Sequence, residues 1–127
     1  MLRGMKAWHV GTTDDFDRWF VDQSEDVQVE VAACVRVLQQ VGPSLGRPLV
    51  DTLNGSKYAN MKELRAKAQG QVIRIAFAFD PKQKALLLTA GAKQGRSEKQ
   101  FYRALIRKAD RLYAAHLGAL KGAADGR

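Results

Sequence analysis

Apolar residues recur at helical spacing soon after the start of the chain. Phe16, Trp19 and Phe20 stand at positions i, i+3 and i+4, and Thr12 or Thr13 ahead of them can cap a helix. The pattern predicts an amphipathic helix that starts beside these threonines and turns one apolar stripe toward the core.

A second helical pattern follows directly, from Ser24 to Val41. Its apolar positions are Val27, Val31, Cys34, Val35, Leu38 and Val41. Gly42 and Pro43 end it, because glycine favours a helix C-terminus and proline cannot continue one. The two helices are expected to form a hairpin, preceded by a short edge strand over residues 6–10.

Residues 42–60 contain two prolines and three glycines, and we expect them to form a long connection without a regular element. The period then changes to two. In residues 61–68, Leu64, Ala66 and Ala68 share one face with Lys62, whereas Arg65 lies on the other. Residues 72–80 alternate bulky and small side chains, and residues 85–91 form an apolar strand. These three strands should form an antiparallel meander.

The last pattern is a helix from Glu98 to about Leu117, with a tail over 118–127 that should fray. The order β-α-α-β-β-β-α predicts one α+β domain over residues 1–127. Its twisted antiparallel sheet would carry the helices on one face and leave the other face open to solvent.

Charge is divided unevenly along these elements. The 127 residues carry a net charge of +8, with 21 Lys and Arg against 13 Asp and Glu. Residues 1–51 hold five basic and eight acidic residues, a net of −3, and residues 52–127 hold sixteen and five, a net of +11. Nucleic acid, an acidic membrane surface or an acidic protein would complement the second part.

Several classes of protein are disfavoured by what the sequence lacks. No signal peptide or membrane-spanning run is visible, and the single Cys34, read as a core residue, fits a reducing compartment. We therefore expect a cytoplasmic protein. His9 and His116 are far apart, and no phosphate-binding loop or GxSxG motif occurs. We expect no metal and no cofactor.

A cluster of cations with a few tyrosines can still cleave RNA. The ribose 2′-OH attacks the adjacent phosphate, so the substrate supplies its own nucleophile. The protein must take a proton, stabilise charge on the phosphorane and protonate the leaving oxygen. Arginine suits the second task because its planar fork binds phosphate through two bonds. Lysine can act as a base only where its surroundings depress its pKa, and tyrosine can stack on a base or transfer a proton.

Three stretches of the sequence carry a family resemblance. "GPSLGRPLVDTLNGSKYANMKELR", "IRIAFAFDPKQKALLLTAGAKQG" and "FYxxxIxxADRLYAAHL" resemble the HigB-like branch of the RelE superfamily, over roughly residues 8–117. The resemblance implies the RelE-like fold and a toxin of a type II toxin–antitoxin module. Such toxins are mostly ribosome-dependent, metal-independent mRNA endonucleases. It also implies a cognate antitoxin partner, expected to be a HigA-like helix-turn-helix protein that covers the basic face with an acidic segment or amphipathic helix.

The resemblance also points to site residues. Arg65 and Arg74 would bind and stabilise the scissile phosphate, Lys93 (or Lys62) would be the general base or charge stabiliser, and Tyr102 would stack or transfer a proton. The further RNA-binding candidates are Lys57, Lys62, Arg96 and Lys99. Many relatives have an acidic residue where this chain has Ala92, which leaves room for an attenuated toxin.

Each candidate has a structural alternative. Arg65 could be a surface charge paired with Glu63, and Lys62 points to the opposite strand face. Arg74, inside an apolar strand, could form an ion pair with Asp80, Glu63 or Asp51. Lys93 could be an ordinary loop lysine, and Tyr102 could pack in the core.

Two rival functions remain open on the sequence: a non-catalytic RNA- or ribosome-binding module, and a DNA-binding regulator. The nuclease hypothesis assumes that cations project together from the open face of the sheet. Cations scattered over distant surfaces, or paired with carboxylates beneath a helix, would count against it.

Overall fold

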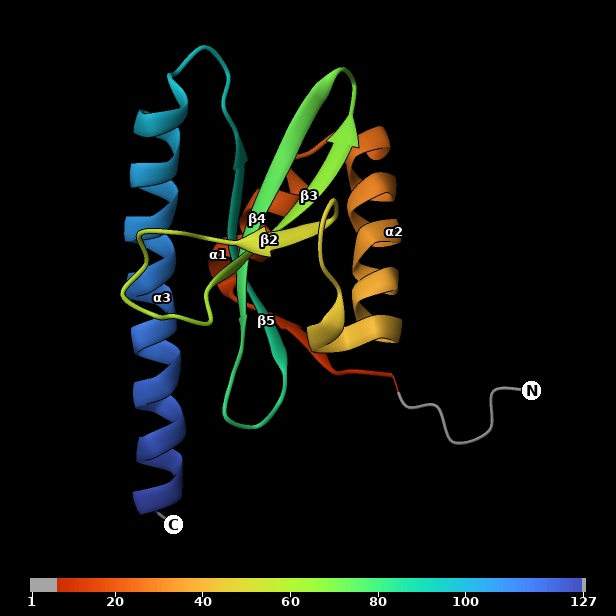
Figure 1. The fold of residues 1–127 in the computed structure, drawn as a ribbon. Coiled ribbons are helices and arrows are strands. Elements are labelled where there is room, and N and C mark those ends of the chain that lie inside the picture. The colour runs from red at the N-terminus through yellow and green to blue at the C-terminus, as the bar shows by residue number, and fades with distance from the viewer. Residues whose placement is uncertain (1–6, 127) are drawn as a thin grey trace, which may run out of the picture.

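The computed structural model describes residues 7–126 and shows an α+β fold (Figure 1). The strands are β1 (Val10–Thr12), β2 (Val50–Thr52), β3 (Lys62–Ala68), β4 (Gln71–Phe79) and β5 (Ala85–Ala92). The helices are α1 (Asp14–Val21), α2 (Glu25–Val41), the short 3-10 helix η1 (Gly42–Ser44) and α3 (Glu98–Gly126). The five strands form one open sheet in the order β1-β5-β4-β3-β2.

The predicted helix starts are confirmed by their caps. The Thr13 side-chain oxygen accepts a hydrogen bond from the Phe16 backbone N–H at 3.0 Å, and the Ser24 hydroxyl accepts one from the Val27 N–H at 3.4 Å. Gly42 ends α2 with φ 73°, a conformation that favours glycine. The Thr13 hydroxyl also donates a hydrogen bond to the Leu88 carbonyl of β5 (Ala85–Ala92) at 2.6 Å, so the cap of α1 fixes where the first helix meets the sheet.

The antiparallel meander is also confirmed, since β3 pairs with β4 and β4 with β5 in antiparallel register. Two details differ from expectation. The connection over 42–60 contains η1 and β2, and β2 pairs with β3 antiparallel, so the prediction of no regular element was wrong. The first strand is Val10–Thr12, parallel to β5; of the predicted 6–10 strand, residue 6 lies outside the described residues.

The helices cover both faces of the sheet, which corrects the expectation of one bare face. Phe16 of α1 and the apolar stripe of α2 pack on one face with Ile73, Ile75 and Phe77 of β4. Phe101 and other residues of α3 pack on the other face, and Figure 1 shows the sheet between α2 and α3. Alanines at alternate positions of β4 (Ala76 and Ala78) are small enough for α3 to lie close to the sheet.

The last helix continues to Gly126, beyond the end predicted near Leu117. Three of its side chains attach loops on the same side of the sheet. The Asp110 carboxylate accepts hydrogen bonds from the Ser56 hydroxyl at 2.5 Å and the Lys57 backbone N–H at 3.0 Å. Tyr113 accepts one from the Asn60 side-chain amide at 3.3 Å.

His116, one turn further along α3, lies 2.7 Å from the Asp80 carboxylate at the β4–β5 turn. The loop before β3 and the turn after β4 are therefore both fixed to α3. Among the described residues, no helix is long and apolar enough to cross a membrane.

Candidate active site

A cleft of about 560 Å³ opens between α2 and α3, where β3 and β4 emerge between the two helices. We call it the α2–α3 cleft. Helix α2 contributes Glu30 and Cys34 to its walls, and α3 contributes Glu98 and Tyr102. The sheet contributes Arg65 and Lys67 of β3 and Val72 and Arg74 of β4, and the loop before β2 contributes Pro48 and Leu49. Three of the four predicted catalytic residues, Arg65, Arg74 and Tyr102, therefore line one cavity.

The two arginines face each other directly across neighbouring strands. Arg65 of β3 and Arg74 of β4 are Cα partners in the register. Like charges in this position repel one another, and such a pair destabilises a sheet unless a counter-charge is supplied. The arrangement concentrates two guanidinium groups at one wall of the cleft.

Glu63 supplies that counter-charge. Its side chain is only 4% exposed, and its Oε2 accepts a hydrogen bond from the Arg65 guanidinium at 2.9 Å. Its Oε1 accepts one from the Tyr102 hydroxyl at 2.8 Å and lies 3.9 Å from the Arg74 Nε. The Tyr102 oxygen in turn accepts a hydrogen bond from the Arg74 Nε at 2.8 Å. Arg65, Glu63, Tyr102 and Arg74 thus form one continuous network.

The two arginines differ in their access to solvent. The Arg65 side chain is 34% exposed, and its Nε is buried and has no hydrogen-bond partner within residues 7–126. Arg74 is 14% exposed, and its guanidinium carbon lies 5.5 Å and 5.4 Å from the ring centroids of Phe101 and Tyr102. Arg65 is consequently the more accessible group, while Arg74 is held between aromatic rings at the start of α3.

Burial and neighbouring charges shift the pKa values of Tyr102 and Arg65. Burial raises the pKa of the Tyr102 phenol, and the adjacent Glu63 carboxylate raises it further, against the opposing effect of Arg74. Burial lowers the pKa of Arg65, but the hydrogen bond and the charge of Glu63 outweigh it, so that the pKa lies above its ordinary value. The phenol therefore stays protonated and Arg65 stays charged near neutral pH.

The remaining predicted residues lie outside the cleft. Lys62 is on the opposite face of β3 from Arg65, as the strand parity predicted, and Lys93 is exposed in the loop after β5. Lys57 and Lys99 are exposed at the surface, and the Arg96 guanidinium lies 5.4 Å from the Phe101 ring centroid. Lys67, which was not singled out by the sequence, lines the cleft instead.

The expectation of an open sheet face was wrong, because α3 covers that face. Beneath the first turns of α3, Arg74 lies within ion-pair distance of Glu63, which is one of the structural alternatives for Arg74. Arg65 also pairs with Glu63 and lies 3.7 Å from Asp51. The cations are nevertheless gathered, not scattered. Together with Lys67 they outnumber the one deeply buried carboxylate among them.

Glu63 is the residue whose importance sequence reasoning missed. It was considered only as a partner for the arginines. A signal did exist, because Glu63 shares the strand face of Met61 and Arg65 and a carboxylate there must either reach solvent or be paired. What strand parity could not show is that Tyr102 arrives from the last helix to complete the pairing.

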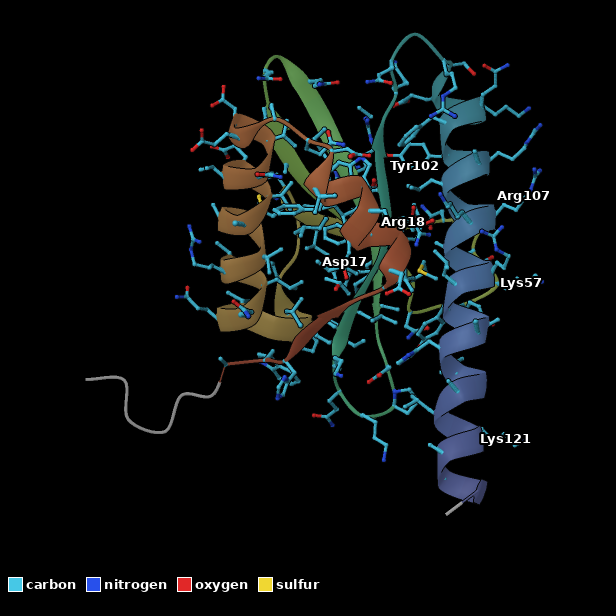
Figure 2. All side chains as sticks on the ribbon, turned by 180° about the vertical axis from the view of Figure 1, so that it is seen from behind. Asp17, Arg18, Lys57, Tyr102, Arg107 and Lys121 are labelled. Atoms are coloured by element: carbon cyan, nitrogen blue, oxygen red, sulfur yellow. The ribbon has the colours of Figure 1, made fainter. Side chains whose placement is uncertain are left out.

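A second cationic feature lies on the outer side of α3. We call it the α3 basic stripe: Lys99, Arg103, Arg107 and Arg111, all exposed and spaced four residues apart. The described carboxylates of this helix face elsewhere, Glu98 toward Arg74 and Asp110 toward the Ser56 loop. Figure 2 shows Tyr102 pointing from α3 toward the sheet, with Arg107 and Lys57 on the far side of the helix.

Like charges four residues apart weaken a helix slightly, by roughly 0.2–0.5 kcal/mol per pair. The stripe therefore opposes helix stability and favours an anionic partner outside the molecule. Within residues 7–126, no group of three or more His, Cys, Asp or Glu side chains is placed to hold a metal ion.

Comparisons with known proteins agree on one family. Residues 18–114 match the family described as phage derived protein Gp49-like. Two proteins of Mycobacterium tuberculosis (strain ATCC 25618 / H37Rv) are similar in sequence. One, named "Putative toxin HigB2", is 46% identical over 112 residues, which cover 85% of this chain and 55% of that protein.

The other, named "Putative toxin HigB3", is 47% identical over 79 residues, which cover 62% of this chain and 68% of that protein. The chain thus spans about half the length of the first relative and about two thirds of the second.

Proposed function

This chain belongs to the phage-derived Gp49-like family as a HigB-like member, and from this premise we propose that it is the toxin of a type II toxin–antitoxin module. We propose further that it is a metal-independent endoribonuclease that cuts mRNA on the ribosome, in the cytoplasm. Its relatives are named as toxins, and a toxin of this kind implies a cognate antitoxin.

One observation carries the nuclease proposal: two arginines stand directly opposite each other at the wall of a cleft, with a tyrosine hydroxyl between them and a buried carboxylate. A phosphodiester in the cleft would accept hydrogen bonds from the exposed part of the Arg65 guanidinium, whose side chain is 34% exposed. Arg74 would add positive charge behind it. Charge that develops on the phosphorane would then be stabilised by preorganised donors.

The α3 basic stripe supports the ribosome-dependent part of the proposal. Its four cations and Lys57 form a surface separate from the cleft and suited to the phosphates of folded RNA. The stripe would hold the toxin on ribosomal RNA while the cleft takes the single-stranded message. The antitoxin would cover these basic surfaces and hold the toxin inactive; a HigA-like helix-turn-helix protein with an acidic segment or amphipathic helix fits this role.

The proposal is tested by adding purified protein to a translating system and mapping mRNA ends. Wild type should fragment the message, and Arg74→Ala and Arg65→Ala should each lower the cleavage rate by about 10²–10³-fold, the usual effect of losing one transition-state donor. Arg36→Ala, on the exposed surface of α2 outside the cleft, should cleave like wild type. Thermal unfolding of each variant shows whether it is folded.

The rival is a non-catalytic module that binds RNA or the ribosome. The ion pairs of Glu63 with Arg65 and Arg74 favour it, because they occupy the same guanidinium groups in a structural role. Ribosome binding by wild type without any new mRNA ends would establish the rival and refute the nuclease.

A further inference from the structure

Glu63 is the buried group that the proposed nuclease leaves without a role in the chemistry. It sits behind the cleft wall, 3% exposed, so no substrate atom can reach its carboxylate. The Tyr102 hydroxyl bridges the gap, because it contacts Glu63 on one side and belongs to the cleft wall on the other. Arg65 and Arg74 also contact Glu63, but neither can accept a proton, so a proton from a bound RNA can reach Glu63 only through Tyr102.

Attack by a ribose 2′-OH requires an acceptor for its proton. Arginine cannot accept one, because its guanidinium stays protonated in proteins. The Tyr102 phenol is also protonated near neutral pH, since burial and the neighbouring carboxylate raise its pKa. A neutral phenol is a poor base by itself, but it can take one proton while passing its own to a carboxylate already bound to it.

We propose that Tyr102 and Glu63 form a two-step proton relay, in which Tyr102 is the catalytic residue and Glu63 the positioning residue that receives the proton. This proposal rests on the nuclease function above. As the 2′-oxygen forms its bond to phosphorus, its proton passes to the Tyr102 oxygen, and the Tyr102 proton passes to the Glu63 Oε1. The bond from phosphorus to the 5′-oxygen breaks, and that oxygen takes a proton from solvent. A cyclic phosphate and a free 5′-hydroxyl result.

The two hydrogen bonds of the Tyr102 hydroxyl, one to Glu63 and one from Arg74, suit this relay. The Tyr102 hydroxyl already donates to Glu63 at 2.8 Å, so the second transfer needs no rearrangement. Arg74 donates to the same oxygen at 2.8 Å and fixes the direction of the phenol proton. The charged groups that face Glu63 are Arg65 of β3 and Arg74 of β4; Asp51 of β2 and Glu98 of α3 face those arginines in turn.

The test compares Glu63→Gln, Tyr102→Phe and the double variant in single-turnover RNA cleavage, with Glu25→Gln as a matched control on the exposed start of α2. Each single variant should lower the cleavage rate constant by about 10²–10⁴-fold, the range for loss of a proton-transfer group. The double variant should be no slower than the slower single variant, because the two residues act as one unit. RNA binding should stay within about twofold of wild type, since the relay acts on the reaction and not on affinity.

A solvent isotope effect separates the relay from a merely structural role. Because two protons move together in wild type, its cleavage rate constant should be lower in deuterated water than in ordinary water, and this isotope effect should be smaller in Glu63→Gln. Loss of RNA binding in place of rate, an unchanged isotope effect in Glu63→Gln, or cleavage at the wild-type rate would each overturn the relay. If Glu63→Gln does not fold, Tyr102→Phe decides alone, because it keeps the Glu63–Arg65 pair and must lose rate without losing affinity.

Failure of the relay and failure of the nuclease give different results. If wild type cleaves RNA and both single variants cleave equally well, only the relay is refuted. If wild type gives no cleavage, the nuclease proposal fails and the relay fails with it.

Discussion

At the scale of single residues, Arg65 and Arg74 show how much of the site a strand pattern can reveal. Alternation placed both arginines off the apolar face, and the resemblance to HigB-like toxins added Tyr102. The structure brings these three residues together. The alternation of β3 alone was enough to place Lys62 on the opposite strand face from Arg65. The position of Lys93 outside the cleft was not predictable, because it depends on the path of the loop after β5.

Glu63 marks the limit of such reasoning. A single strand shows which face a carboxylate occupies, but its partners come from β4 and from a helix 39 positions later in the chain. The pairing is a property of tertiary structure, and only the folded chain brings one carboxylate into contact with two arginines and a tyrosine.

Asp80 gives a prediction at the same scale. Burial raises the pKa of its carboxyl, but the hydrogen bonds from His116 and from the backbone N–H groups of Lys84 and Lys82 outweigh this, and the pKa lies below its ordinary value. A carboxyl with a depressed pKa in the folded state stabilises the protein above the unfolded pKa of about 3.9, and this stabilisation is lost as the pH falls through the folded value.

Asp80→Asn should therefore lower the free energy of unfolding by about 1.5–3 kcal/mol near neutral pH, the range for a hydrogen bond to a charged group. The difference from wild type should shrink as the pH drops below about 4. Urea denaturation at several pH values measures it, with the exposed Asp22→Asn as control. A difference that stays constant with pH would contradict the assignment.

At the scale of elements, the helices and the meander were predictable because their signals are local. Caps at Thr13 and Ser24 and the period of two in β3 and β4 each depend on a few neighbouring residues. The placement of α3 was not predictable in this way. The alanine-rich face of β4, which was interpreted as open, is the surface that α3 covers, and small residues are compatible with either solvent or a close helix.

The short strand β2 was missed for a related reason. Three residues, Val50–Thr52, are too few to produce a period in a segment rich in proline and glycine. They form a strand because β3 offers an unpaired edge that they can join.

The prediction at this scale concerns Asp110, which fixes the loop before β3 to α3. Asp110→Ala would leave the Ser56 hydroxyl and the Lys57 N–H without this acceptor, and it should lower the free energy of unfolding by about 1–3 kcal/mol. Asp22→Ala, at the exposed end of α1, should change it by less than about 0.5 kcal/mol. Chemical denaturation measures both, and equal effects of the two substitutions would show that the loop contact is unimportant.

At the scale of the whole molecule, charge is separated between two sides. Helices α1 and α2 carry six carboxylates, and Asp22 between them adds a seventh, whereas the exposed outer side of α3 carries the basic stripe. The acidic start of α2 and the basic stripe of α3 lie on opposite faces of the sheet, whereas Asp15 of α1 contacts α3 and pairs with Lys108 at 2.9 Å. The basic side would meet RNA, and the acidic start of α2 would face away from it.

This separation predicts the salt dependence of RNA binding. Replacing Arg107 and Arg111 together by Gln should reduce the slope of log affinity against log salt concentration by about 2, because each lost phosphate contact removes about one unit. Arg36→Gln, on the acidic side, should leave the slope unchanged. Filter binding to folded ribosomal RNA over a range of salt concentrations gives the slopes. Equal slopes for all three proteins would exclude the stripe as a contact surface.

One consequence concerns how the length of this chain can change over evolution. Tyr102, at the cleft, and Asp110, at the loop before β3, sit on the same straight helix. A single residue inserted between them would turn one end by about 100° relative to the other, because a helix has 3.6 residues per turn. Deletions and insertions can then be tolerated in the β3–β4 turn or past His116, but the number of residues between Tyr102 and Asp110 has to stay the same.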